Sequence, residues 1–181
     1  MATTKNQVHR SISLPSRPHP TTIELHQQLH KLKTWESTSS SSSSSHSICT
    51  SLSMLDDLYT SLDDLLHMSS TQQAISHHQN EPCVEELLEA SLRVLDICGI
   101  TKDTLLLQIK ENVRSLHSAL RRRKQDSCVE RSVGSSVEKM KIVHGRLEDL
   151  EMAIESIENG LESVFRRLIK TRASLLNIIS L

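Results

Sequence analysis

The chain has 181 residues, a formal net charge of −1 and a pI near 6.8, and only 2% of its residues are aromatic. This length supports one domain with its own core. A charge so close to zero provides no general attraction to phosphate backbones, so we expect no nucleic-acid partner. Binding to a membrane surface would need a local basic patch.

Composition and spacing predict an all-α fold, because Leu, Ile, Val and Met recur at helical intervals and the chain has only four Gly and four Pro. We predict an antiparallel helical bundle with a long C-terminal helix and a disordered N-terminal tail. The four Cys include no CxxC pair, which indicates thiols in a reducing compartment, and the N-terminus lacks the apolar block of a secretory signal. The expected location is the cytoplasm.

Residues 1–20 form the predicted disordered tail, and residues 21–181 form the predicted bundle domain. The tail is cationic, with Lys5, Arg10 and Arg17 and no acidic residue. Organelle transit peptides share this composition, so a plastid location is one alternative, and the cytoplasmic face of a membrane is the other.

The first helix is predicted to begin at a capping box made by Thr21 and Glu24 and to end near Trp35. A Ser-rich linker is expected at 37–47, inside the bundle domain, because Ser side chains cannot bury apolar surface. The next helix is predicted over 48–66.

Two pairs of Asp in that helix, at 56–57 and 63–64, are predicted to face solvent. The polar segment 69–80 carries no helix prediction. Two more helices are predicted at 82–98 and 101–123, separated by Gly99 in a left-handed C-terminal conformation.

The last helix is predicted to begin near Val129 and to extend for about 50 residues, or about 75 Å. Each buried apolar side chain contributes about 1.5 to 3 kcal/mol, against an ordering cost of about 1.5 kcal/mol per residue, so this helix must pack against others. Its apolar stripe, in which only Thr171 is polar, repeats every three or four positions: Met140, Val143, Leu147, Leu150, Ile154, Ile157, Leu161, Val164, Leu168, Leu175 and Ile178.

No catalytic, cofactor-binding or metal-binding residue is assigned. The chain lacks the GxSxG, GxGxxG and GxxxxGK[ST] motifs, and its few Gly do not cluster into a phosphate cradle. His26 and His30 share one helical face, but no Cys, Asp or Glu has the spacing of a third metal ligand. These features predict a protein that is not an enzyme and has no cofactor.

One short motif in the tail predicts a partner. Arg10, Ser11, Ser13 and Pro15 have the form Arg-Ser-x-Ser-x-Pro. Phosphorylation of Ser13 would create a dianion that an arginine cluster of a 14-3-3 protein binds. The four residues are therefore a candidate phospho-dependent partner site.

A second interpretation is a peripheral membrane or trafficking adaptor. Its basis is a group of cations near the apolar C-terminal end: Arg166, Arg167, Lys170 and Arg172.

Several strings in a fixed order resemble one family. They are RSISLPSRPHP (10–20), LDDLYTSLDDLL (55–66), VLDICG (94–99), HSALRRRK (117–124) and ESIENGLESVFRRLIKTRASLLN (155–177). The chain is similar to the plant-specific domain of unknown function 241 family, the Bypass-like proteins. The resemblance implies a regulatory plant protein connected to root and shoot development that acts through protein interactions, and it supplies no catalytic positions.

The chain departs from this family in one respect. Relatives have a further helical stretch between the Arg-rich helix end and the terminal helix, whereas here Lys124 is followed almost directly by 132–139. A bundle that lacks this middle region would expose apolar surface and favour self-association.

Overall fold

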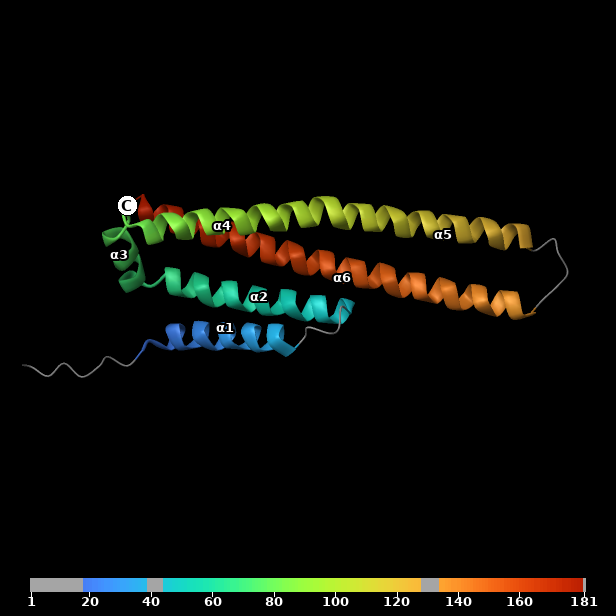
Figure 1. Cartoon of the computed structure of the whole chain (residues 1–181), viewed down its shortest axis with the longest axis horizontal. Coiled ribbons are helices and arrows are strands. Elements are labelled where there is room, and N and C mark those ends of the chain that lie inside the picture. Colours follow the sequence, from blue (N-terminus) through green and yellow to red (C-terminus); the bar gives the residue numbers. More distant parts are fainter. Residues whose placement is uncertain (1–17, 39–43, 128–133, 181) are drawn as a thin grey trace, which may run out of the picture.

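The computed structural model describes residues 18–38, 44–127 and 134–180, and every regular element within them is a helix (Figure 1). The all-α prediction is confirmed. None of the helices in these ranges has both the length and the apolar character needed to cross a membrane. In chain order the elements are α1 (Pro20–Thr38), α2 (Ser45–Leu66), α3 (Ser69–His77), α4 (Pro82–Ile100), the π-helical turn η1 (Thr101–Leu106), α5 (Leu107–Ser127) and α6 (Gly134–Ile179).

The longest helix, α6, organises the molecule. It has 46 residues, so it is about 69 Å long. The predicted long C-terminal helix is thereby confirmed, although it begins at Gly134. Together, α4, η1 and α5 form one continuous rod that runs antiparallel to α6 (Figure 1). Near the middle of the rod, the Cys98 Sγ lies 4.0 Å from the Leu161 carbonyl oxygen.

The helix α2 packs along the other side of α6 and runs in the same direction. Leu52 of α2 lies against Gly160, Asp56 bonds to Ser163, and Asp63 bonds to Lys170, so residue numbers rise together along the two helices. The pairing of α2 with α6 is therefore parallel, within a bundle whose consecutive long helices, α1 with α2 and the rod with α6, are antiparallel.

The stripe predicted for α6 forms the core. Most of its members from Leu147 to Ile178 are buried, and Thr171 is buried among them. The main cluster joins α2, the rod and α6, and a smaller cluster joins Leu66, Leu175 and Ile178 at the end near α3. Val143 and Leu150 are exceptions, since each is 43% exposed. Both precede by more than two turns the point where Leu52 of α2 lies against Gly160, and α2 begins only two turns before Leu52.

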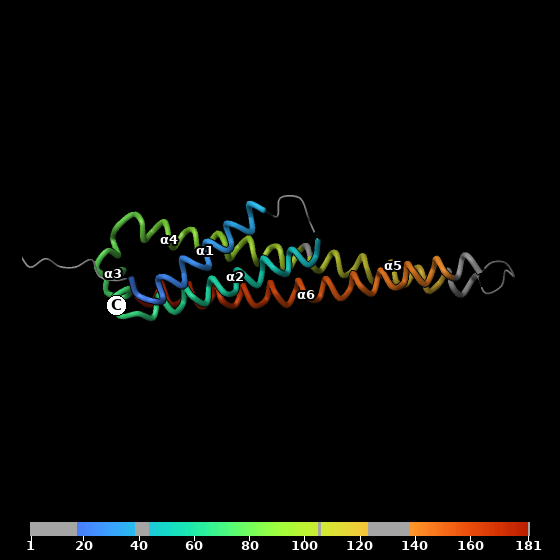
Figure 2. The backbone as a smooth tube through the Cα atoms, turned by 90° about the horizontal axis from the view of Figure 1, so that it is seen from below, coloured from blue at the N-terminus to red at the C-terminus, as the bar shows by residue number. Residues whose placement is uncertain are grey.

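The first helix contacts the body through α2 and has no buried residue. Figure 2 shows α1 and α4 on the same side of the layer formed by α2 and α6. The predicted capping box is wrong. The helix begins at Pro20, which suits a first helical position, and the Thr21 N–H donates to His19 Nδ1 at 3.3 Å. Glu24 accepts a bond from Gln28 instead.

The helix boundaries shorten the predicted linker. The first helix continues to Thr38 and α2 begins at Ser45, where the Ser44 side chain accepts a bond from the Ser47 N–H and caps the helix. Both helices therefore extend into the predicted linker, and Ser44 within it caps α2. Residues 39–43 of the linker lie outside the described residues. Most of the predicted tail, 1–17, also lies outside them. The segment 69–80, for which no helix was predicted, contains α3.

The predicted helix end at Gly99 is wrong. The backbone continues through Gly99 in a helical conformation and passes into η1, where the Thr101 hydroxyl donates to the Ile97 carbonyl oxygen at 2.7 Å. A Cβ at Gly99 would lie 3.7 Å from Phe165 of α6, an ordinary contact, so this glycine is not needed for a turn. Packing on α6 continues along the rod, and this outweighs the low helix propensity of one glycine.

Candidate functional site

The candidate phospho-dependent site, Arg10, Ser11, Ser13 and Pro15, lies outside the described residues. The structure therefore leaves it as a sequence prediction. The polar site that the structure does describe is the seam between α2 and α6, and sequence reasoning missed it.

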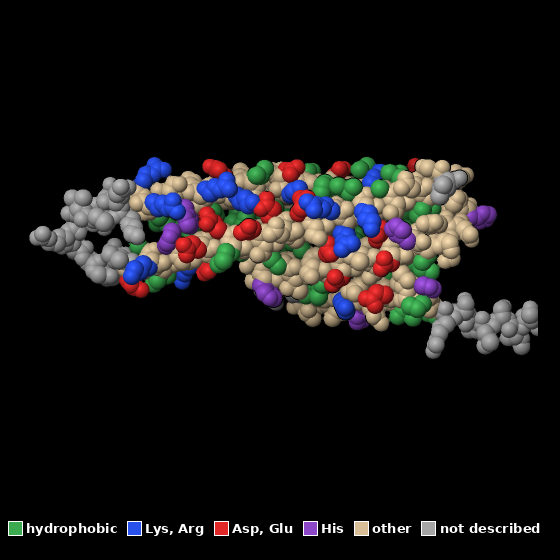
Figure 3. Space-filling model, turned by 180° about the vertical axis from the view of Figure 1, so that it is seen from behind, with side chains coloured by type: hydrophobic (Ala, Val, Ile, Leu, Met, Phe, Trp, Pro, Cys, Tyr) green, Lys and Arg blue, Asp and Glu red, His purple; other side chains and the backbone are tan. Residues whose placement is uncertain are grey.

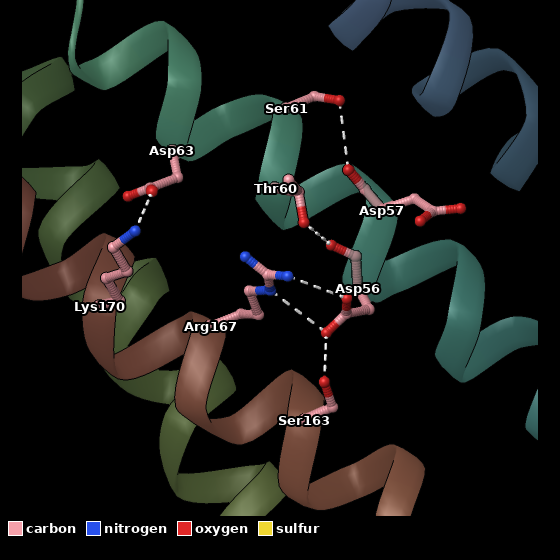
Figure 4. Close-up of polar contacts among 8 residues, drawn as sticks. All are labelled: Asp56, Asp57, Thr60, Ser61, Asp63, Ser163, Arg167 and Lys170. Carbon is pink, nitrogen blue, oxygen red and sulfur yellow. Dashed lines mark hydrogen bonds and ion pairs between the residues drawn. The ribbon is translucent and has the colours of Figure 1, made fainter.

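Asp56 on α2 makes the central contacts of this seam (Figure 4). Its Oδ1 accepts a bond from the Ser163 hydroxyl at 2.6 Å. Arg167 reaches the same carboxylate with its Nε at 3.3 Å and its Nη2 at 3.4 Å. Two groups of α6 therefore hold one carboxylate of α2, which fixes the register of the parallel pair.

Asp63 occupies the equivalent position two turns further along α2. Only 6% of the residue is exposed, and its Oδ2 accepts a bond from Lys170 Nζ at 2.6 Å. Its Oδ1 has no hydrogen-bond partner, and His67 Nδ1 lies 3.7 Å from it. The prediction that both Asp pairs face solvent is thus wrong for Asp56 and Asp63, because these members of each pair point toward α6. Asp57 and Asp64 are exposed as predicted.

The rod is joined to α6 by a second group of polar contacts. Lys102 pairs with Glu162 and lies 5.4 Å from the centre of the Phe165 ring, and Lys110 pairs with Glu158. Arg172 donates to the Leu88 carbonyl oxygen at 2.6 Å and to the Ser91 hydroxyl at 2.7 Å. Charged contacts therefore border the apolar core on both sides of α6.

The four cations of the adaptor interpretation all have partners within the chain. Arg167 and Lys170 bond to Asp residues of α2, Arg172 bonds to α4, and Arg166 bonds to Glu162 at 2.9 Å. On the face drawn in Figure 3, Lys and Arg side chains are interspersed with Asp and Glu. This arrangement weakens the basis of the adaptor interpretation, because anionic lipid attracts unpaired cations most strongly.

The pKa shifts reflect packing and ion pairing. The hydrogen bond from Lys102 lowers the pKa of Glu162, with a further contribution from Arg166, and the same pair raises the pKa of Lys102. Burial raises the pKa of the Cys98 thiol and of the Tyr59 hydroxyl, so both stay protonated at neutral pH. Each shift favours the protonation state that the group ordinarily has at neutral pH, which is typical of structural groups.

An open cleft of about 420 Å³ lies between α5 and α6 and includes Lys110, Arg114, Glu151 and Glu155. Its lining includes no Ser, Thr, Cys or His, the residues that most often form a nucleophile and its base in covalent catalysis. Within the part of the chain that the structure describes, no three His, Cys, Asp or Glu side chains gather closely enough to bind a metal ion. His26 and His30 are both exposed on α1.

Comparison with known proteins assigns the family. The family model described as Protein BPS1 matches residues 51–137 and 126–178, which together cover more than half of the chain. The chain belongs to the BPS1 family of Bypass-like proteins. No curated protein and no solved structure matches it. The matched residues of this BPS1 family member include most of α2, the rod and most of α6, and therefore the residues that form the polar contacts of the α2–α6 seam.

Proposed function

We propose that this BPS1 family member is a non-enzymatic regulatory protein of root and shoot development in plants, and that it acts in the cytoplasm by binding other proteins. Family membership is the observation that carries the proposal, since it suggests a plant developmental regulator. The helical architecture is consistent with this role, because its described polar groups are used in packing contacts between helices.

The proposed first partner is a 14-3-3 protein that binds phosphorylated Ser13. Arg10 lies three residues before Ser13, where many basic-directed kinases require it, and Pro15 lies two residues after it. The motif ends five residues before α1 begins at Pro20. In the sequence, Ser13 therefore precedes the first helix that the structure describes.

We expect the full chain phosphorylated at Ser13 to bind a purified 14-3-3 protein at least tenfold more tightly than the unmodified chain, because the added dianion makes charge-assisted hydrogen bonds with arginines. Isothermal titration calorimetry would measure both affinities. A chain phosphorylated at Ser11 is the matched control and should bind like the unmodified chain. Equal affinity of the Ser13-phosphorylated and unmodified chains would contradict this partner.

The alternative function, a membrane or trafficking adaptor, predicts binding to anionic lipid, whereas the main proposal predicts little binding. Since Arg167, Lys170 and Arg172 are engaged within the chain, we expect less than a tenth of the protein to sediment with vesicles containing 30% phosphatidylserine at physiological salt. A polybasic peptide would be the positive control. Sedimentation of most of the protein would favour the adaptor function.

A further inference from the structure

An exposed apolar strip lies on the helical hairpin of α5 and α6, beyond the end of α2. Its five members are between 42% and 53% exposed, although most of them belong to the stripes that form the core elsewhere. The members of this hairpin strip are Ile109 and Leu116 on α5 and Ile142, Val143 and Leu150 on α6.

The hairpin strip continues the surface on which α2 packs. Val143, Leu150, Ile157 and Val164 follow one another at steps of seven residues along α6. In the core, Ile157 is half-buried and Val164 is buried. Leu52 lies against Gly160, and α2 begins only two turns before Leu52. The α6 residues more than about two turns before Gly160 therefore have no neighbour in α2.

The two helices present the members of the hairpin strip on the same side. Val113 and Leu147 are buried in the seam between α5 and α6, while Lys110 and Glu151 line the open cleft on one side of it. Helical geometry places Ile109, Leu116 and the α6 members of the strip on the opposite side, the side of α2. Three uncharged residues lie beside the strip on α5: Asn112, Ser115 and Ala119. Charged residues are likewise depleted in the central part of protein interfaces.

We infer that the hairpin strip binds the hairpin strip of a second copy of this chain, so that two hairpins form a four-helix bundle related by a two-fold axis. Charge favours a second copy as the occupant. Between 107 and 122, α5 carries four cations and one anion, whereas α6 between 138 and 155 carries five anions and three cations. Opposite net charges face each other when α5 of each copy lies over α6 of the other.

The dimer is tested with the full-length chain by sedimentation velocity from about 1 to about 100 µM. In this range even a small interface gives a measurable fraction of dimer. We expect the wild type to shift from the monomer to the dimer mass within this range. Leu116→Lys with Leu150→Lys should raise the dissociation constant at least tenfold. Leu107→Lys with Met152→Lys changes two residues of the same helices outside the strip, which are 63% and 59% exposed, and should leave the constant within twofold.

A second measurement does not depend on any variant. Amide hydrogen exchange of the wild type should slow at 109–116 and 142–150 when the concentration rises, and should stay constant in α1 and α3. A wild type that remains monomeric at about 100 µM overturns the inference. So does a dimer that both double variants weaken equally, or one whose protection appears outside the strip. The inference does not depend on the proposed partner of Ser13.

Discussion

Replacing Lys170 by methionine is expected to lower the free energy of unfolding by about 2 kcal/mol. Lys170→Met keeps the aliphatic stem and the helix propensity but removes the ammonium that bonds to Asp63. The Asp63 carboxylate, which is 6% exposed, then has no charged hydrogen-bond partner. Hydrogen bonds to charged groups contribute about 1.5 to 3 kcal/mol, and the partial exposure of Lys170 places the cost below the range for fully buried pairs.

Arg166→Met is the matched control for this prediction. Arg166 lies one turn earlier on α6 and pairs with Glu162 on the solvent side, so its replacement should cost less than about 0.5 kcal/mol. In the background of Asp63→Asn, Lys170→Met should cost much less, since no charge is left buried. Urea unfolding of the four variants would give the coupling energy. Equal costs for Lys170→Met and Arg166→Met would show that the seam does not hold α2.

The sequence predicts most of the helices because their apolar spacing is regular. The stripe from Leu147 to Ile178 is a clear example, since its burial follows directly from its three-four repeat. Helix ends are less well predicted, because they depend on competition between local signals and packing. Gly99 has the local character of a helix end, but the residues on either side of it, including Cys98, pack on α6. Tertiary contacts therefore extend the helix through the glycine.

The parallel direction of α2 and α6 could not be derived from periodicity. An apolar stripe indicates which face of a helix is buried, and it has the same form in either direction. The direction follows here from the chain between the two helices: α3 turns it at one end, and the rod carries it back to the start of α6 (Figure 1). The seven-residue step between Asp56 and Asp63 was a usable signal. It matches the step between Ser163 and Lys170, so it indicates which faces of the two helices meet, although an equal step fits either direction.

The opposite behaviour of two glycines in α6 tests that parallel packing directly. A Cβ built at Gly160 would lie 3.0 Å from Leu52 Cδ1 and 3.2 Å from Leu52 Cβ, which is too close for the present packing. A Cβ at Gly145 would have no heavy atom within 4 Å. Both glycines occupy the interior of the same helix, so alanine gives each the same gain in helix propensity, about 1 kcal/mol.

Gly160→Ala is therefore expected to lower the unfolding free energy by up to about 2 kcal/mol, because displacing Leu52 costs about 1 to 3 kcal/mol in overpacking and this cost offsets the propensity gain of about 1 kcal/mol. Gly145→Ala should raise it by about 0.5 to 1 kcal/mol. Thermal unfolding followed by circular dichroism would measure both. In the background of Leu52→Ala, the Gly160→Ala substitution should become stabilising, since the atoms that obstruct the new methyl group are gone. Stabilisation by Gly160→Ala in the wild-type background as large as that by Gly145→Ala would mean that α2 does not approach α6 at Gly160, and the register set by Asp56 and Asp63 would then be wrong as well.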